Sequence, residues 1–207
     1  MQIAFLLYPR FTALDIVGPY DVLSRLPDAQ PWFVAKEAGP VRNDNGRLQL
    51  VAEKTLDEVP SPDILVVPGG SGTTDAADAA TLGWIRKAHA TSTWTTSVCT
   101  GSLLLASAGL LDGQLATSHW SAEEQLEELG AIYRPERYIR VGKIITAAGV
   151  SAGIDMALHL AGEIAGPTTA QAIQLLIEYD PEPPYDAGSM AKAPPDAVKT
   201  LQQMFGP

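Results

Sequence analysis

The chain has 207 residues, of which 46% are hydrophobic and 18% charged, and this composition predicts one folded domain with a full apolar core. Its formal net charge of -10 argues against binding to nucleic acid or to an anionic membrane, because both attract clustered positive charge. One cysteine excludes an intramolecular disulfide, and with only three histidines it argues against a Cys/His zinc site. The start of the chain lacks the basic segment of a signal peptide, and no apolar run is long enough to span a bilayer, so we expect a cytoplasmic protein.

Apolar runs and helical patterns alternate along the first half of the chain. Four continuous apolar runs of strand length cover residues 3–7, 32–35, 64–67 and 93–98. Continuous hydrophobicity indicates strands that are covered on both faces, as in a parallel sheet under helices. Helical patterns follow at residues 13–26, 81–90 and 101–108. This order predicts an α/β fold with a doubly wound, mostly parallel sheet flanked by helices.

The second half continues the pattern and ends in a different kind of segment. We expect a short strand at 114–117, a helix at 121–129 that begins with a Ser121/Glu124 capping box, a hairpin around Gly142, and helices at 150–165 and 168–178. Five prolines between residues 180 and 195 exclude a helix or a central strand there. We therefore predict a single domain over residues 1–207, with a proline-rich tail from about residue 180 that ends in an amphipathic segment and wraps the surface or packs on a partner subunit.

Cys99 is the strongest candidate for a chemical centre, because it lies where an apolar strand pattern passes into a helical pattern. Ser97 before it and Gly101 after it are small enough to provide the clearance that a nucleophile elbow requires. At the start of a helix, free N–H groups and the helix dipole would lower the pKa of the thiol. The alternative is a buried cysteine that acts as a small hydrophobic residue. The context of strand, cysteine, glycine and helix favours the nucleophile.

A glycine-rich turn, Pro68-Gly69-Gly70-Ser71-Gly72, follows the third apolar run. Ligands of open α/β sheets bind at the carboxyl ends of strands, so we expect this turn beside Cys99. It would supply an oxyanion hole of backbone N–H groups, with Gly70 and Thr100 as the donors. A loop without a function is the alternative, whereas a phosphate loop is excluded because its Gly-Lys-Ser/Thr sequence is missing.

Two further residues are candidates for proton transfer. Asp15 lies among apolar residues after the first strand, where a carboxylate must be paired or protonated. We predict Asp15 as the acid and base, in preference to Asp21 and to a simple helix N-terminal charge. His119 is either a base for the thiol or a packed histidine, and the sequence leaves both readings open.

Together these motifs resemble the ThiJ/PfpI superfamily, which has a flavodoxin-like, class I glutamine amidotransferase-like fold. The segments that carry the resemblance are LLYPRFTALDIVGPYDVL, ILVVPGGSG, TSVCTGSLLLASAGLLDG, TSHW and AAGVSAGIDMAL. Within the superfamily the chain is most similar to the isocyanide hydratases, also through QLLIEYDPEPPYDAGS near its end. The resemblance implies Cys99 as nucleophile, Asp15 as its acidic neighbour, Thr100 as a contact of that acid, no cofactor or metal, and a homodimer. Because a thiolate and a neighbouring carboxylate repel each other, we then expect Cys99 and Asp15 to share one proton, as thiolate and carboxylic acid. Arg10 and residues 147–150 depart from the pattern and leave the substrate preference open.

The function that the resemblance implies is hydration of an isocyanide by water to an N-substituted formamide, through a thioimidate on Cys99. Three alternatives stay open. A related enzyme of 2-oxoaldehydes would use the same cysteine and His119 as a proton shuttle. A redox sensor would instead oxidise Cys99 to the sulfinate without turnover. A binding module would be the ligand-sensing core of a transcriptional regulator without its DNA-binding half.

Overall fold

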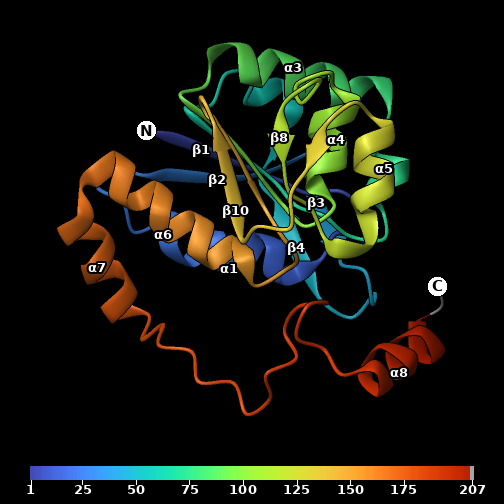
Figure 1. Cartoon of the computed structure of the whole chain (residues 1–207). Coiled ribbons are helices and arrows are strands. Elements are labelled where there is room, and N and C mark those ends of the chain that lie inside the picture. Colours follow the sequence, from blue (N-terminus) through green and yellow to red (C-terminus); the bar gives the residue numbers. More distant parts are fainter. Residues whose placement is uncertain (206–207) are drawn as a thin grey trace. The chain divides into compact units, whose positions relative to one another are not determined.

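The computed structural model describes residues 1–205, which fall into two compact units, Met1–Ile177 and the residues from Glu178 onward. Figure 1 shows the elements of the chain in sequence colours. The strands are β1 (Gln2–Leu6), β2 (Gln30–Ala35), β3 (Gly39–Arg42), β4 (Gln49–Ala52), β5 (Lys54–Thr55), β6 (Ile64–Val67), β7 (Trp94–Val98), β8 (Leu115–Ala116), β9 (Ile132–Tyr133), β10 (Tyr138–Val141) and β11 (Ile144–Ala147). The α-helices are α1 (Ala13–Leu23), α2 (Thr73–Ala76), α3 (Ala79–Thr91), α4 (Gly101–Ser107), α5 (Glu123–Glu128), α6 (Ala152–Ala165), α7 (Pro167–Leu176) and α8 (Pro195–Phe205).

A seven-stranded sheet in the order β10-β11-β7-β6-β1-β2-β5 forms the centre of the first unit. All its neighbouring strands are parallel except β10, which runs antiparallel to β11. Helices α1 and α6 lie together on one face, and α3, α4 and α5 lie on the other (Figure 1). The predicted fold, a doubly wound and mostly parallel sheet flanked by helices, is confirmed.

The central strands are buried on both faces, as their continuous hydrophobicity predicts. All four residues of β6 are fully buried, and so are Ile3, Ala4 and Phe5 of β1. On one face α1 and α6 pack closely because Gly18 has no side chain, and a Cβ there would lie 2.9 Å from Ile154 Cγ1. This close packing fixes α1, and therefore Asp15, against the sheet.

Several small elements were not expected from the sequence. The β3–β4 hairpin forms a separate two-stranded sheet, and its residues show neither a continuous apolar run nor a clean alternation.

The predicted capping box at Ser121 is wrong, because α5 begins at Glu123 without a side-chain cap. Ser121 instead contacts the His119 ring. A capping box does occur at Thr55, which pairs with Glu58 at the start of a 3-10 turn.

The second unit begins close to the predicted start of the tail. Its proline-rich part has no regular secondary structure up to α8, as expected from the proline content. Helix α8 forms where the amphipathic segment was predicted. That the whole chain acts as one domain stays a prediction, and residues 206–207 of the predicted tail lie outside the described residues. Across residues 1–205 no helix combines the length and the apolar character that a membrane span needs.

Candidate active site

Three neighbouring parallel strands bring the predicted site residues to one edge of the sheet. Asp15 lies on α1 after β1, Gly69 follows β6, and Cys99 follows β7. Strand β6 lies between β1 and β7, and all three run parallel, so their carboxyl ends meet. The chain leaves β1 toward β2 on one side and later returns to β6 on the other, and such a switch point is where open α/β sheets bind ligands.

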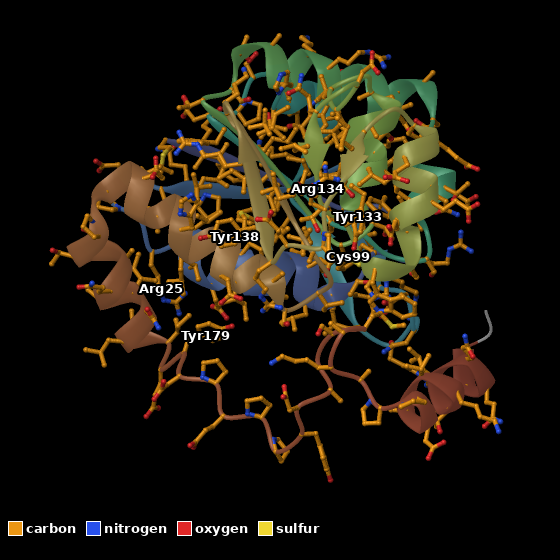
Figure 2. All side chains as sticks on the ribbon, viewed as in Figure 1. Arg25, Cys99, Tyr133, Arg134, Tyr138 and Tyr179 are labelled. Atoms are coloured by element: carbon orange, nitrogen blue, oxygen red, sulfur yellow. The ribbon has the colours of Figure 1, made fainter. Side chains whose placement is uncertain are left out.

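Cys99 lies inside the first unit at the end of β7 (Figure 2) and is only 6% exposed. Its φ of 57° is in the left-handed region, which a non-glycine residue rarely adopts and which marks a strained elbow. Gly101 allows the following helix to approach β6, because a Cβ there would lie 2.3 Å from the Val67 carbonyl oxygen. The predicted strand–cysteine–glycine–helix geometry is therefore present.

Hydrogen bonds hold the strained backbone of Cys99 at both its N–H and its carbonyl group. Its N–H donates to the carbonyl oxygens of Ala147 at 3.1 Å and Ala148 at 3.0 Å. Its carbonyl accepts the hydroxyl groups of Ser102 at 3.2 Å and Ser118 at 3.0 Å. These four hydrogen bonds come from three different segments, so they can maintain a conformation that costs about 1–3 kcal/mol.

Asp15 is fully buried, as its apolar neighbours predict. The Gly69 N–H donates to Oδ2 at 2.8 Å, whereas Oδ1 has no N–H or O–H partner among residues 1–205. Burial raises the pKa of Asp15 from 3.8 to about 7, with the Gly69 hydrogen bond and the Cys99 thiol opposing this shift and Asp44 adding to it. A carboxyl with this pKa can both donate and accept a proton near neutral pH.

The Cys99 thiol responds to the same surroundings. Burial, and after it the charge of Asp15, raise the pKa of Cys99 to about 12. The N–H groups of Thr100 and Val150 and the Thr100 hydroxyl act in the opposite direction, and their combined effect is smaller. The lowering of this pKa that we expected from the helix terminus is thus outweighed, because the sulfur is withdrawn from solvent and faces a carboxylate. At neutral pH and without a bound substrate, the proton of the Cys99/Asp15 pair therefore lies mainly on the Cys99 sulfur when Asp15 is a carboxylate.

Gly70 and Thr100, the two predicted oxyanion donors, are in direct contact. The Gly70 N–H donates to Thr100 Oγ1 at 2.9 Å, so this N–H is engaged within the protein. Gly69 has to be a glycine, because a Cβ there would lie 2.5 Å from the Thr100 nitrogen. The N–H groups that act on the sulfur belong to Thr100 and Val150, and the sequence did not point to Val150.

The structure places His119 near the site but does not join it to Cys99. Among residues 1–205 the hydrogen bonds of its ring go to Ser121, whose N–H donates to Nδ1 at 3.3 Å. The ring packs against the loop after β11, since a Cβ on Gly149 would lie 2.8 Å from His119 Cδ2. Burial lowers the pKa of His119, which favours the neutral ring. This geometry fits the packed histidine that we considered beside the base.

Two buried residues of the site were missed at the level of sequence, Tyr8 and Thr73. The Tyr8 hydroxyl donates to the Pro68 carbonyl at 2.7 Å, and Thr73 Oγ1 lies 2.9 Å from Thr100 Oγ1. Tyr8 ends an apolar run, and Thr73 follows a glycine-rich turn, so neither stands out in a single sequence. Their contacts join segments 65 residues apart and depend on the folded sheet.

Arg10, which departs from the family pattern, lines a neighbouring cavity. It has a φ of 65° and forms an ion pair with Asp75. The cavity has a volume of about 780 Å³ and opens beside the ends of β1 and β2, with Arg10, Arg42 and Gly72 among its lining residues. Within the described part of the chain, no three side chains of His, Cys, Asp or Glu are grouped so that they could hold a metal ion.

The DJ-1/PfpI family model matches residues 1–163, which include β1, β6, the elbow and most of α6. The chain belongs to the DJ-1/PfpI family. It is 46% identical over 208 residues to isonitrile hydratase of Pseudomonas putida, covering 100% of this chain and 91% of that protein. A crystal structure of a ThiJ/PfpI family protein from Pseudomonas syringae superposes with a TM-score of 0.94 at 42% identity, over 98% of this chain and 85% of that one.

Members of the DJ-1/PfpI family also occur as parts of longer proteins. The chain is 34% identical over 173 residues to the HTH-type transcriptional regulator CdhR of Pseudomonas aeruginosa, over 80% of this chain but only 51% of the regulator. The superfamily predicted from the sequence motifs is thus confirmed.

Proposed function

We propose that this protein hydrates isocyanides to N-substituted formamides, with Cys99 as the nucleophile and Asp15 as the group that moves protons. The observation that carries the proposal is the 46% identity to isonitrile hydratase, which extends over the whole chain. The roles of the two residues are supported by their burial beside each other at the strand ends and by the raised pKa of Asp15.

The first step adds the thiol across the terminal carbon of the isocyanide, R–N≡C. Asp15 accepts the Cys99 proton, and the thiolate sulfur donates an electron pair to that carbon. The same carbon takes the proton from Asp15, so R–N=CH–S–Cys99 forms and Asp15 returns to the carboxylate. The low exposure of the site keeps water from competing for the proton during this exchange.

The second step releases the product and restores the pair. Asp15 takes a proton from water as the water oxygen attacks the imidate carbon, and then passes this proton to nitrogen to give R–NH–CH(OH)–S–Cys99. The intermediate collapses when its hydroxyl proton moves to Asp15, the C=O bond forms and the C–S bond breaks. The thiolate recovers its proton from Asp15, and the formamide R–NH–CHO leaves.

Backbone and hydroxyl groups assist by stabilising charge on the sulfur and the intermediates. The N–H groups of Thr100 and Val150 act on the sulfur. Gly70 contributes through Thr100, whose hydroxyl oxygen it holds in place. Preorganised donors of this kind cost no reorganisation during the reaction.

Incubation with benzyl isocyanide tests the proposal, with the formyl proton of N-benzylformamide followed by NMR. We expect turnover by the natural chain, none above the uncatalysed rate by Cys99→Ala, and a loss of at least about 100-fold in Asp15→Asn, the scale of a removed general acid–base. A thioimidate adduct on Cys99, trapped at short times and identified by mass spectrometry, would support the intermediate. Turnover that persists in Cys99→Ala would refute the mechanism.

The same assay separates the alternatives. Conversion of methylglyoxal without conversion of isocyanide would instead indicate a 2-oxoaldehyde enzyme. Inactivity toward both substrates would favour a redox sensor or a binding module, and the similarity to half of a transcriptional regulator gives the binding module its specific support. Peroxide treatment followed by mass spectrometry would then show whether Cys99 forms the sulfinate.

The homodimer implied by the family resemblance belongs to the same proposal. Light scattering coupled to size-exclusion chromatography should give about twice the chain mass at micromolar concentration. A mass of one chain at that concentration would contradict the dimer and leave the chemistry at Cys99 unaffected.

A further inference from the structure

We infer that Thr73 is a positioning residue that acts through the Thr100 hydroxyl, accepting its hydrogen bond while Cys99 is a thiol and returning one when the sulfur is a thiolate. The effect of Thr73 on turnover rests on the proposed hydration, whereas its effect on the reactivity of the Cys99 thiol does not. Thr73 is 5% exposed and lies at the first position of α2, directly after the glycine-rich turn.

Three buried hydroxyl groups lie next to one another, and the hydrogen bonds of two of them, Thr73 and Thr100, form the chain that supports this inference. The Tyr8 hydroxyl donates to the Pro68 carbonyl at 2.7 Å and lies 3.2 Å from Thr73 Oγ1. Thr73 Oγ1 donates to the Gly70 carbonyl at 2.7 Å and lies 2.9 Å from Thr100 Oγ1. Each hydroxyl has one proton, and those of Tyr8 and Thr73 are given to carbonyl oxygens. The proton between Thr73 and Thr100 therefore comes from Thr100.

In this arrangement the Thr100 hydrogen points away from Cys99. Its oxygen accepts the Gly70 N–H at 2.9 Å and keeps one lone pair free, and this hydroxyl is one of the groups that act on the pKa of the Cys99 thiol. This polarity suits a protonated sulfur, because a thiol donates a hydrogen bond and accepts one only weakly. It does not suit the thiolate that the reaction needs.

The opposite polarity is available because the Gly70 carbonyl has a second donor. The Thr73 N–H also reaches this carbonyl, at 3.1 Å, so the Thr73 hydroxyl can rotate away without leaving the oxygen unpaired. Thr73 then donates to Thr100, and Thr100 donates to the sulfur. A thiolate favours this polarity, because charge-assisted hydrogen bonds are about twice as strong as neutral ones and neighbouring bonds polarise each other.

Tyr8 takes no part in this reversal, because its proton is already given to the Pro68 carbonyl. It is 4% exposed, and burial raises the pKa of its phenol, which therefore remains a neutral donor to Pro68. Reversal of the chain needs only rotations about two C–O bonds, at Thr73 and Thr100, with no proton passing between heavy atoms. The reversal can thus accompany the movement of the shared proton from Cys99 to Asp15.

A double-mutant cycle tests the inference, with Thr73→Val, Thr100→Val and the double variant. The measurements are kcat and KM for benzyl isocyanide and the rate of Cys99 alkylation by iodoacetamide at pH 8. We expect Thr73→Val to lower kcat and the alkylation rate about fivefold each, the scale of one hydrogen bond, with KM unchanged within a factor of two. Thr73→Ser should restore both rates, because it returns the hydroxyl.

The cycle distinguishes action through Thr100 from a loss of local structure. In the Thr100→Val background, Thr73→Val should cause no further loss, whereas a purely structural defect would add to the loss. Thr74→Val is the matched control, because Thr74 is the exposed neighbour of Thr73 on α2 and should keep both natural rates. If the bulk of valine prevents folding, the double-mutant cycle is measured with Thr73→Ala instead.

Natural rates in Thr73→Val, or an additive loss in the double variant, would overturn the inference. If the natural chain does not hydrate isocyanide, the proposed function fails, but the alkylation cycle still decides the role of Thr73. A slower alkylation in Thr73→Val that disappears in the Thr100→Val background would then support the positioning role by itself.

Discussion

Replacement of Asp15 by asparagine should stabilise the protein at neutral pH while it abolishes turnover. The carboxyl is fully buried and has one N–H donor, from Gly69 to Oδ2. Asparagine has nearly the same shape, and its amide oxygen can accept that hydrogen bond. The substitution therefore removes the cost of a buried negative charge without removing the contact.

The size of the effect follows from the pKa of Asp15, which burial raises from 3.8 in an open chain to about 7 in the fold. Between these two pH values the folded protein binds more protons than the unfolded chain, so the free energy of unfolding falls as pH rises. The full loss is about 4 kcal/mol and is complete above pH 7. Between pH 5.5 and pH 8 the natural chain should lose about 2 kcal/mol relative to Asp15→Asn.

Urea unfolding followed by tryptophan fluorescence, at half-unit steps of pH from 5.5 to 8, measures this difference. Asp21→Asn is the control, because Asp21 lies on the same helix with a side chain that is 51% exposed. It carries the same change in net charge without burial. A constant difference between the natural chain and Asp15→Asn over this range would refute the reasoning, because it would mean that Asp15 titrates alike in both states.

Three further predictions concern the same site, and a fourth concerns helix α3. The value of kcat/KM should rise with pH through about 7 and then level off, because the reactive pair holds one proton and takes up a second below the pKa of Asp15; a profile that is flat from pH 5.5 to 8 would contradict this. Gly69→Ala should reduce turnover at least about 100-fold and lower the melting temperature, because its Cβ would lie 2.5 Å from the Thr100 nitrogen. Gly83→Ala in helix α3, where a Cβ has no neighbour within 4 Å, should instead raise stability by about 0.5–1 kcal/mol. Finally, Cys99→Gly should be more stable than Cys99→Ala by about 1 kcal/mol in denaturant unfolding, since glycine adopts the φ of 57° without strain; equal stabilities would mean that the elbow is unstrained.

Much of the architecture could be predicted from local patterns. The buried strands β1, β6 and β7 appear as continuous apolar runs, and the helices between them follow from their periodicity. The β3–β4 hairpin was missed because each of its strands has only four residues and buries a single one, Val41 or Ala52, which is too little for a recognisable apolar pattern. The capping box at Ser121 matched the pattern of residues, but the serine contacts His119 instead, and sequence spacing cannot decide between two available partners.

Within the site, the sequence by itself determined which residues could do chemistry. A lone cysteine between a strand and a helix, with Gly101 after it, predicts the elbow, and an aspartate among apolar residues predicts a buried acid. Both signals are local, because each depends on the immediate neighbours of one residue. That Asp15 and Cys99 face each other was expected only from the resemblance to a family.

The tertiary structure decided how these groups behave. The pKa of Cys99 is raised rather than lowered because burial and the Asp15 charge outweigh the nearby N–H groups. The Gly70 N–H is taken by Thr100, and Tyr8 contacts a threonine 65 residues away. Solvent exposure, charge separation and hydrogen-bond partners depend on which distant segments the parallel strands bring to one edge, and single-sequence patterns contain no such distances.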